Sequence, residues 1–206
     1  MDKFPRAFQW VLASVLLLAV ASRMEKINPL SRLVPDVLYL LPPRKIIGEY
    51  EGGIRIDFGH LITPLQANDT PTSFRWRENF PDRLYVLMML DMDGPSRTDP
   101  VNGPVNHWLV GNIDGGQDNS WRNGTVLAEY SRPRPQTGTG LHRYVFLVYM
   151  QPRGGNISFT ETVIPAGPSV ARRNFDYRQF AIKYGLGQPY AVNYFQSMFV
   201  PGEFDD

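Results

Sequence analysis

Three short, uninterrupted apolar runs constrain the fold of this chain more than any other feature. They span residues 85–90, 108–110 and 144–150, and the longest reads Tyr-Val-Phe-Leu-Val-Tyr-Met. Runs of this length are too short for long helices and are typical of strands that are buried on both faces of a sheet. We therefore expect a β-sheet with these segments as its central strands.

The turn-forming residues favour the same architecture. Glycine and proline each contribute 18 of the 206 residues, a density that favours short strands joined by many turns. Residues 53–58 alternate apolar and polar side chains and predict a half-buried strand, and residues 125–130 and 157–160 are weaker strand candidates. There is no internal repeat and no alternation of strands with long helices, which argues against Rossmann and TIM-barrel folds.

Two short helices are predicted, one near each end of the chain. The first lies between Asn28 and Pro35. For the second, we expect Asn174 to cap the start and Gly185 to end the helix. Four of its residues have the i, i+3, i+4, i+7 spacing that forms one helical face: Tyr177, Phe180, Ala181 and Tyr184. The predicted fold is therefore mostly β and mainly antiparallel.

The composition excludes several classes of function. Lysine and arginine number 21 and aspartate and glutamate 20, so this nearly neutral chain gives no reason to expect nucleic acid as a partner. The chain contains no cysteine, which excludes disulfides, thiolate metal ligands and a cysteine nucleophile.

The first 21 residues have the pattern of a secretory signal peptide. Two basic residues precede an uncharged apolar run at residues 10–21, which ends in the small-x-small pattern Ala-Val-Ala of a cleavage site. The run is shorter than the roughly 20 apolar residues that span a membrane, although an uncleaved signal anchor is the alternative. We expect a signal peptide at 1–21, an N-terminal extension at 22–44, a main domain at 45–206, and secretion of the mature chain.

Three N-glycosylation sequons agree with export. They begin at Asn68, Asn123 and Asn156. The alternative is that these triplets arise by coincidence in a sequence rich in turns.

Four polar side chains fall at the ends of the predicted central strands. Asp91 and Asp93 follow the first apolar run, His107 directly precedes the second, and His142 opens the strand that holds the third. The ends of strands lie at the rim of a sheet, where loops build sites. We therefore expect the four side chains to converge, although each histidine taken alone could have an ordinary structural role.

Two carboxylates and two imidazoles could form a metal site, an acid–base pair or an anion pocket. The H-E-x-x-H motif of zinc hydrolases and the G-x-S-x-G motif of serine hydrolases are absent. Because a nearby carboxylate favours imidazolium, such a cluster suits an anion that shares a proton, such as a phosphate ester. Gly138 lies in a Gly-Thr-Gly turn before His142, where backbone N–H groups could form an anion nest.

Several blocks of the sequence, in order and with compatible spacing, carry a family resemblance. The main blocks are Asp91-Met92-Asp93-Gly94-Pro95-Ser96-Arg97, His107-Trp108-Leu109-Val110 and Gly138-Thr139-Gly140-Leu141-His142-Arg143-Tyr144. Other fitting stretches are Ile62-Thr63-Pro64 with Gln66, Pro71-Thr72-Ser73 with Trp76, and Phe195-Gln196. From about residue 45 to residue 200, the chain resembles the phosphatidylethanolamine-binding proteins.

The resemblance implies an antiparallel β-sandwich with a few short peripheral helices and a small anion pocket at one end of the central sheet. It implies that Asp91, Asp93, His107 and His142 line this pocket. It further implies that Pro95 shapes the adjoining turn and that Tyr144 lies near the pocket floor.

The resemblance also implies a binding protein rather than an enzyme, and we expect no cofactor and no metal. The expected ligand is a phosphate-containing small molecule or a phospholipid head group, bound by a monomer. Members of the family are also associated with serine-protease inhibition and with the modulation of kinase signalling. The alternative function is therefore an inhibitor that acts on a protease or signalling protein while its pocket is vestigial.

The chain departs from the family pattern at three places. Arg134, flanked by Pro133 and Pro135, falls where a pocket-lining glycine is expected. Its guanidinium could turn inward to a phosphate or outward into solvent, and we include it among the ligand-binding candidates. Val105 stands where an aromatic residue is common, and the chain has a shorter C-terminal segment than many members, which implies a more open pocket.

Overall fold

The computed structural model describes residues 32–76, 80–115, 118–153 and 155–203, and the chain divides into two units, Met1–Leu40 and Leu41–Asp206. The expected signal peptide and the start of the first predicted helix lie outside the described residues. The described part of the first unit contains turns in which the backbone N–H groups of Val37 and Leu38 both donate to the Leu33 carbonyl. No helix among the described residues is long and apolar enough to cross a membrane.

The second unit is built mainly from strands. These are β1 (Arg44–Tyr50), β2 (Ile54–Ile56), β3 (His60–Leu61), β4 (Ser73–Trp76), β5 (Leu84–Asp91), β6 (Val105–Asp114), β7 (Thr125–Ala128), β8 (His142–Met150) and β9 (Ala191–Ser197). The helical elements are α2 (Tyr177–Lys183) and three 3-10 turns, η2 (Glu51–Gly53), η3 (Ser120–Asn123) and η4 (Val170–Arg172). The structure therefore confirms a mostly β fold with short peripheral helices.

The strands are hydrogen-bonded in the order β2-β1-β9-β8-β5-β6-β7, with β3 beside β9 and β4 beside β1. Most neighbours are antiparallel, but β9 runs parallel to both β1 and β3, so the sheet is mixed. The predicted apolar runs fall in β5, β6 and β8, and the side chains of β5 and β8 are buried along almost their entire length. The long runs thus form the centre of the sheet, as the sequence predicts.

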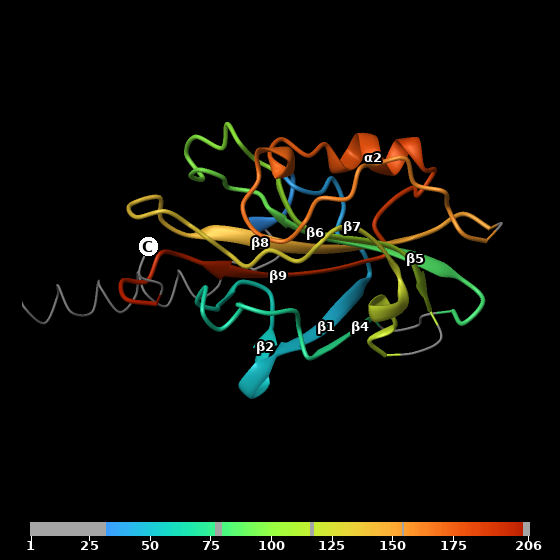
Figure 1. Cartoon of the computed structure of the whole chain (residues 1–206), viewed down its shortest axis with the longest axis horizontal. Coiled ribbons are helices and arrows are strands. Elements are labelled where there is room, and N and C mark those ends of the chain that lie inside the picture. Colours follow the sequence, from blue (N-terminus) through green and yellow to red (C-terminus); the bar gives the residue numbers. More distant parts are fainter. Residues whose placement is uncertain (1–31, 77–79, 116–117, 154, 204–206) are drawn as a thin grey trace, which may run out of the picture. The chain divides into compact units, whose positions relative to one another are not determined.

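Within the second unit, two layers cover the faces of the part of the sheet formed by β5, β6, β8 and β9 (Figure 1). One face packs against the smaller group of strands β1, β2 and β4, and the other lies beneath α2. The core between the sheet and the smaller strand group includes Ile46, Phe74, Leu87, Phe146 and Phe195, each no more than 1% exposed. Burying large apolar side chains contributes roughly 1.5–3 kcal/mol each, so this layer supplies much of the favourable free energy of folding.

The predicted strand at 157–160 is wrong. The Ile157 N–H donates to the Asn112 carboxamide oxygen, and the Ile157 carbonyl accepts from the same carboxamide. The Thr160 N–H donates to the Tyr184 hydroxyl. Side chains thus take the backbone groups that a strand would pair with a neighbour.

The predicted cap of α2 is also wrong, whereas its predicted end agrees with the structure. Asn174 has a left-handed φ of 52° and precedes the helix, and Asp176 is the residue whose side chain accepts from the Gln179 N–H. At the other end, Gly185 has a φ of 61°, the left-handed conformation in which glycine commonly terminates a helix.

Candidate anion-binding site

The sheet topology brings three predicted site residues to one end of the central strands. Asp91 ends β5, His107 lies near the start of β6, and His142 begins β8. Asp91 is opposite Val105 on one side and Tyr144 on the other. Since neighbouring antiparallel strands run in opposite directions, the end of β5 must lie beside the starts of both β6 and β8.

These residues line a cavity of about 340 Å³, a size within the usual range for small-ligand sites. Of the predicted ligand-binding residues, five line it: Asp91, Pro95, His107, Arg134 and His142. The other lining residues are Gly94, Asn102, Val105, Ser131, Gln136, Pro168, Ser169, Val170, Arg172 and Arg173. Asp93, Gly138 and Tyr144 do not belong to the lining.

The hydrogen bonds of His142 suit a doubly protonated ring. Its Nδ1 lies 2.8 Å from Asp91 Oδ2, and a carboxylate oxygen can only accept a hydrogen bond. Its Nε2 lies 2.9 Å from Thr139 Oγ1, whose own proton is donated to the Gln136 carbonyl. Both ring nitrogens can therefore donate, as they do in an imidazolium.

The environment of His142 agrees with this assignment. Burial alone lowers the pKa of a histidine, but the hydrogen bond and the charge of Asp91 outweigh it, and the pKa of His142 is raised above 6.5. Asp91 is held in turn, because its Oδ1 accepts the backbone N–H of Asp93 at 2.9 Å.

His107 is a neutral ring, in contrast to His142. Its Nδ1 lies 2.7 Å from the Ser131 carbonyl, so this nitrogen carries a proton. Burial lowers the pKa of His107 below 6.5, although the charge of Asp91 opposes the shift. In the neutral ring the remaining nitrogen, Nε2, is a hydrogen-bond acceptor.

Tyr144 contacts both imidazoles with its ring. Its ring meets His107 edge-on at a centroid distance of 5.2 Å and stacks on His142 at 6.5 Å. The side chain is completely buried, and its hydroxyl has no hydrogen-bond partner by distance and angle among the described residues. Burial raises the pKa of this hydroxyl well above 10, so Tyr144 is a neutral packing element under the site.

Asp93 makes a separate buried ion pair. Its Oδ2 accepts from the backbone N–H of Arg143 at 2.9 Å and from Arg143 Nε at 2.8 Å, and its Oδ1 accepts from Nη2 at 2.7 Å. Asp93 is 1% exposed and Arg143 is 4% exposed. This bidentate pair ties the turn after β5 to the start of β8 and directs Asp93 away from the cavity.

Arg172 places a buried positive charge in the cavity wall and was not anticipated from the sequence. Its side chain is 2% exposed, and its Nη atoms donate to the carbonyls of Asn106, Glu129 and Pro165. No ion pair joins the guanidinium to a carboxylate among the described residues, and Nε has no hydrogen-bond partner there. Burial lowers the pKa of Arg172, although the charge of Glu129 opposes the shift.

The segment at residues 131–140 contributes Ser131, Arg134 and Gln136 to the lining of the cavity. Arg134 is exposed, does not have a positive φ, and makes no side-chain hydrogen bond or ion pair with the residues that the structure describes. Gly138 and Gly140 have φ values of 79° and 78°, and they hold the intervening Thr139 against His142. The turn therefore presents a hydroxyl to the site, where the sequence suggested backbone N–H groups.

The three sequon asparagines have different surroundings. Asn123 and Asn156 are exposed, whereas Asn68 is half-buried. Asn68 Oδ1 accepts from Arg132 Nη1 at 2.9 Å, and its Nδ2 donates to Asp69 at 3.0 Å. Glycosylation at all three positions stays a prediction.

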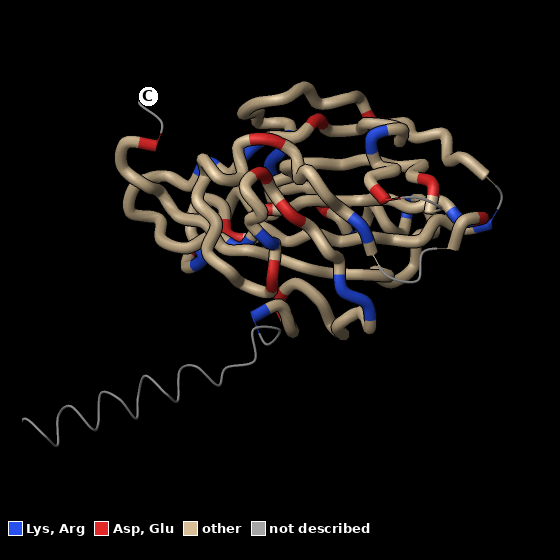
Figure 2. Tube along the Cα trace, turned by 90° about the horizontal axis from the view of Figure 1, so that it is seen from below, with Lys and Arg blue, Asp and Glu red and all other residues tan. Residues whose placement is uncertain are grey.

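Basic and acidic positions of the second unit are both scattered over the visible trace (Figure 2). The cavity differs from this average, because its lining includes three arginines and one aspartate. No group of three or more histidine, aspartate or glutamate side chains within the described ranges is arranged to hold a metal ion. The lining of the cavity therefore carries more basic than acidic side chains.

Comparison with known proteins identifies the family. The family model for phosphatidylethanolamine-binding protein matches residues 53–195. The chain belongs to this family. A 26 kDa secreted antigen of Toxocara canis is 35% identical over 167 residues, which cover 81% of this chain and 61% of the antigen. The matched region thus spans less than two thirds of that relative.

Solved structures of the family share the fold. The solution structure of CG7054 is 39% identical, with a TM-score of 0.65 over 81% of this chain and 91% of that one. A carboxypeptidase Y inhibitor, solved with its cognate proteinase, is 24% identical with a TM-score of 0.70, covering 86% of this chain and 96% of that chain. The phosphatidylethanolamine-binding protein of Plasmodium vivax is 23% identical with a TM-score of 0.68, covering 84% and 96%.

Proposed function

We propose that this chain is a secreted binding protein whose cavity holds a phosphate ester, either a free small molecule or a phospholipid head group. The observation that carries the proposal is the charge of the cavity. Its lining combines three arginines with one aspartate, and that aspartate is already paired with the His142 imidazolium. A site with this excess of positive charge and a buried guanidinium is complementary to an anion.

The geometry supports a specific mode of binding. The Thr139 hydroxyl lies 2.9 Å from His142 Nε2, and a ligand oxygen could take its place. A phosphate oxygen that replaces Thr139 would accept a charge-assisted hydrogen bond from the imidazolium, which is stronger than the bond it displaces. His107 Nε2, an acceptor, suits the protonated oxygen of a phosphate monoester, while Arg172 and Arg134 add charge.

Secretion and binding without turnover are two further parts of the proposal. Secretion is supported by the signal-peptide pattern and by the secreted antigen that is 35% identical. Binding without turnover is favoured because the polar groups of the site are engaged in holding one another: Asp91 with His142, and His107 with Ser131.

Calorimetric titration of the secreted protein with inorganic phosphate and phosphoethanolamine tests the proposal. Replacing His142 by Gln removes the charged donor, and we expect binding to weaken by about 10- to 150-fold, the equivalent of 1.5–3 kcal/mol. His60→Gln is the matched control, because His60 is exposed on β3 and lies outside the cavity lining. Unchanged affinity in His142→Gln, or no phosphate binding by the unmodified protein, would refute the proposal.

Inhibition of a protease or signalling protein is the alternative. The carboxypeptidase Y inhibitor shares the fold with this chain, and Arg134, Gln136 and Thr137 form an exposed stretch that could contact a protein. An inhibition assay separates the two functions, because inhibition that persists in His142→Gln would not depend on the anion cavity.

A further inference from the structure

The lining of the anion cavity offers no free counter-ion to a positively charged group. Its one acidic side chain, Asp91, is already paired with His142 at 2.8 Å. The arginines of the lining are Arg134, Arg172 and Arg173. We propose that the site selects phosphate esters whose ester group carries a second negative charge, and that Arg134 determines this specificity. The inference rests on the proposed phosphate-ester function and specifies which esters the cavity prefers.

The cavity also lacks the aromatic surface that can hold an ammonium group. Among the described residues that line it, none is phenylalanine, tyrosine or tryptophan, and the nearby Tyr144 is completely buried. Contact with the face of such a ring is the usual alternative to a carboxylate for binding an organic cation. An ammonium group beside the bound phosphate would therefore lose water without gaining a partner, which is unfavourable.

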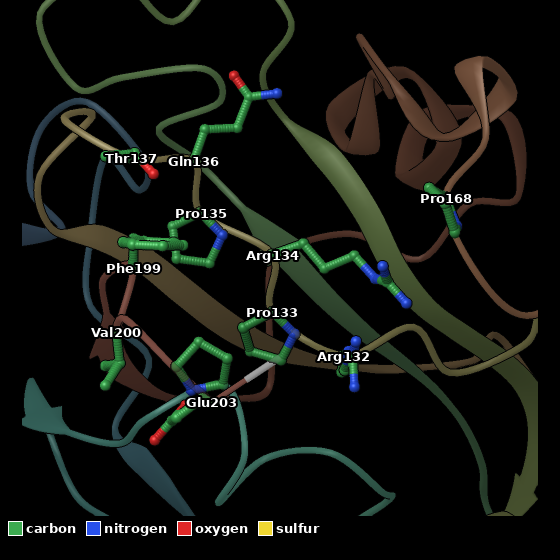
Figure 3. Close-up of a pocket in the computed structure, with 11 residues that line it drawn as sticks. Arg132, Pro133, Arg134, Pro135, Gln136, Thr137, Pro168, Phe199, Val200 and Glu203 are labelled. Carbon is green, nitrogen blue, oxygen red and sulfur yellow. The ribbon is translucent and has the colours of Figure 1, made fainter. Parts of the chain in front are cut away.

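Arg134 is available to a ligand, unlike Arg172. The Arg172 side chain is 2% exposed, and its Nη atoms donate to three backbone carbonyls. The Arg134 side chain is exposed and makes no hydrogen bond or ion pair with the residues that the structure describes. In Figure 3 it extends from Pro135 toward Pro168, which lines the anion cavity. Its planar guanidinium can bind a carboxylate through two parallel hydrogen bonds, whereas it repels an ammonium group.

Arg134 also lies where an ester group can leave the anion cavity. An adjoining cavity of about 570 Å³ includes Arg134 in its lining, whereas Arg173 lines only the anion cavity of the two. The acidic residue of the adjoining cavity, Glu203, accepts the Leu65 N–H at 2.9 Å. In Figure 3 the Glu203 carboxylate lies on the far side of Pro133 from the Arg134 guanidinium. A short ester group that points toward this cavity therefore meets Arg134 before Glu203.

Three small phosphate monoesters that differ in the charge of the ester group test the inference. Phosphoethanolamine carries an ammonium group, ethyl phosphate carries no charge there, and phosphoglycolate carries a carboxylate. Calorimetry compares their affinities at one pH and one ionic strength. Because Arg134 is exposed, each charge contributes modestly, and we expect phosphoglycolate to bind about five- to thirtyfold more tightly than phosphoethanolamine. Ethyl phosphate should lie between them.

Variants at position 134 assign the preference to one side chain. Arg134→Gln removes the charge, so we expect the affinity ratio of phosphoglycolate to phosphoethanolamine to fall by at least about threefold. Arg134→Lys keeps the charge and should preserve the order of the three esters. Since Arg134→Gln also weakens the binding of phosphate itself, the ratio is the readout, and residual phosphate binding shows that the variant is folded. Arg178→Gln is the matched control, because Arg178 is exposed on α2 and lines neither cavity.

Vesicle sedimentation separates the two sources of such a ligand. Phosphatidylcholine vesicles are compared with vesicles that also contain phosphatidylserine, whose head group carries a carboxylate, or phosphatidylethanolamine. Binding to the phosphatidylserine vesicles that Arg134→Gln weakens would support the inference with a lipid head group as the source. Binding of phosphoglycolate without binding to any vesicle would support it with a free ester. A preference for the phosphatidylethanolamine vesicles would overturn it.

The outcomes separate this inference from the proposed function. If phosphoethanolamine bound as tightly as phosphoglycolate while inorganic phosphate was still bound, the inference would be overturned and the proposed function would stand. No binding of any phosphate would refute both. A preference for phosphoglycolate that is unchanged in Arg134→Gln, or that Arg178→Gln removes equally, would overturn the role of Arg134. A preference for phosphoethanolamine that Glu203→Gln removes would show that the ester group meets Glu203 instead, and would also overturn the inference.

Discussion

Asp91 and Asp93 are two residues apart and of the same type, yet the structure gives them different surroundings. Asp91 lines the anion cavity and holds the His142 imidazolium at 2.8 Å. Asp93 is withdrawn into a bidentate pair with Arg143 and does not line the cavity. One carboxylate therefore contributes to the charge of the site, whereas the other fastens the loop that shapes it.

Of the changes considered, removal of the Asp93 carboxylate should lower the free energy of unfolding the most. Asp93→Ala leaves the Arg143 guanidinium buried without its carboxylate, and we expect the free energy of unfolding to fall by about 3–5 kcal/mol. Urea unfolding measures it. Asp57→Ala is the control, because the Lys45–Asp57 pair has side chains that are 41% and 43% exposed and should contribute about 1 kcal/mol or less. Equal losses in the two variants would contradict the structural role of Asp93.

A smaller effect is expected at Asp91. Asp91→Asn keeps a hydrogen-bond acceptor for His142 but removes the charge, so stability at neutral pH should fall by about 1 kcal/mol. Phosphate affinity should fall as well, because the imidazolium is less favoured. Exposed Asp82→Asn serves as the control. A loss of stability at Asp91 as large as that at Asp93, with phosphate binding unchanged, would remove the distinction between the two carboxylates.

The two cavity histidines predict opposite pH dependences of stability. The pKa of His142 is raised, so its contribution is fully present below the unfolded value near 6.5 and is lost as the pH rises through the folded pKa. The pKa of His107 is lowered, so the unfolded state binds the extra proton and stability falls as the pH drops below 6.5. Stability can be measured by urea unfolding at several pH values. His142→Gln should flatten the pH dependence of stability on the alkaline side, and His107→Gln should flatten it on the acidic side. The reverse assignment would contradict the hydrogen-bond geometry.

A still smaller effect is expected at Thr139, whose hydroxyl contacts His142 Nε2. Thr139→Val removes the acceptor from His142 Nε2, so phosphate no longer displaces it. We expect phosphate to bind about two- to tenfold more tightly in calorimetry, because it no longer has to break the bond between the imidazolium and the hydroxyl. Weaker binding would mean that the hydroxyl contacts the ligand and does not compete with it.

The sequence predicts the central sheet because the apolar runs of β5, β6 and β8 need no distant partner to be recognised. It does not predict β9, whose Asn193 and Gln196 are polar residues in a buried strand. Asn193 is accommodated because its Nδ2 donates to the carbonyls of Ile46 and Ile56, on strands about 140 positions earlier in the chain. Tertiary hydrogen bonds of this kind leave no local pattern.

At the candidate site too, contacts between residues far apart in the chain could not be predicted from the sequence. The proximity of Asp91, His107 and His142 could be predicted, because antiparallel pairing places the ends of their strands side by side. The different surroundings of Asp93 depend on Arg143, which is 50 residues away in the chain. Arg172 gave no local signal, because arginine is usually exposed and its burial here depends on carbonyls from three other segments.

Nuclear magnetic resonance titration of the three histidine side chains, with and without phosphate, tests the central claim that His142 is the cationic donor of an anion site and His107 its neutral partner. We predict that His142 titrates above 6.5 and that phosphate raises its pKa further, because the anion favours imidazolium. His107 should titrate below 6.5 and shift on phosphate binding, while the exposed His60 should not respond. If the two cavity histidines titrated at the same pH and phosphate shifted neither of them, the assignment of His142 as the cationic donor and His107 as its neutral partner would be contradicted.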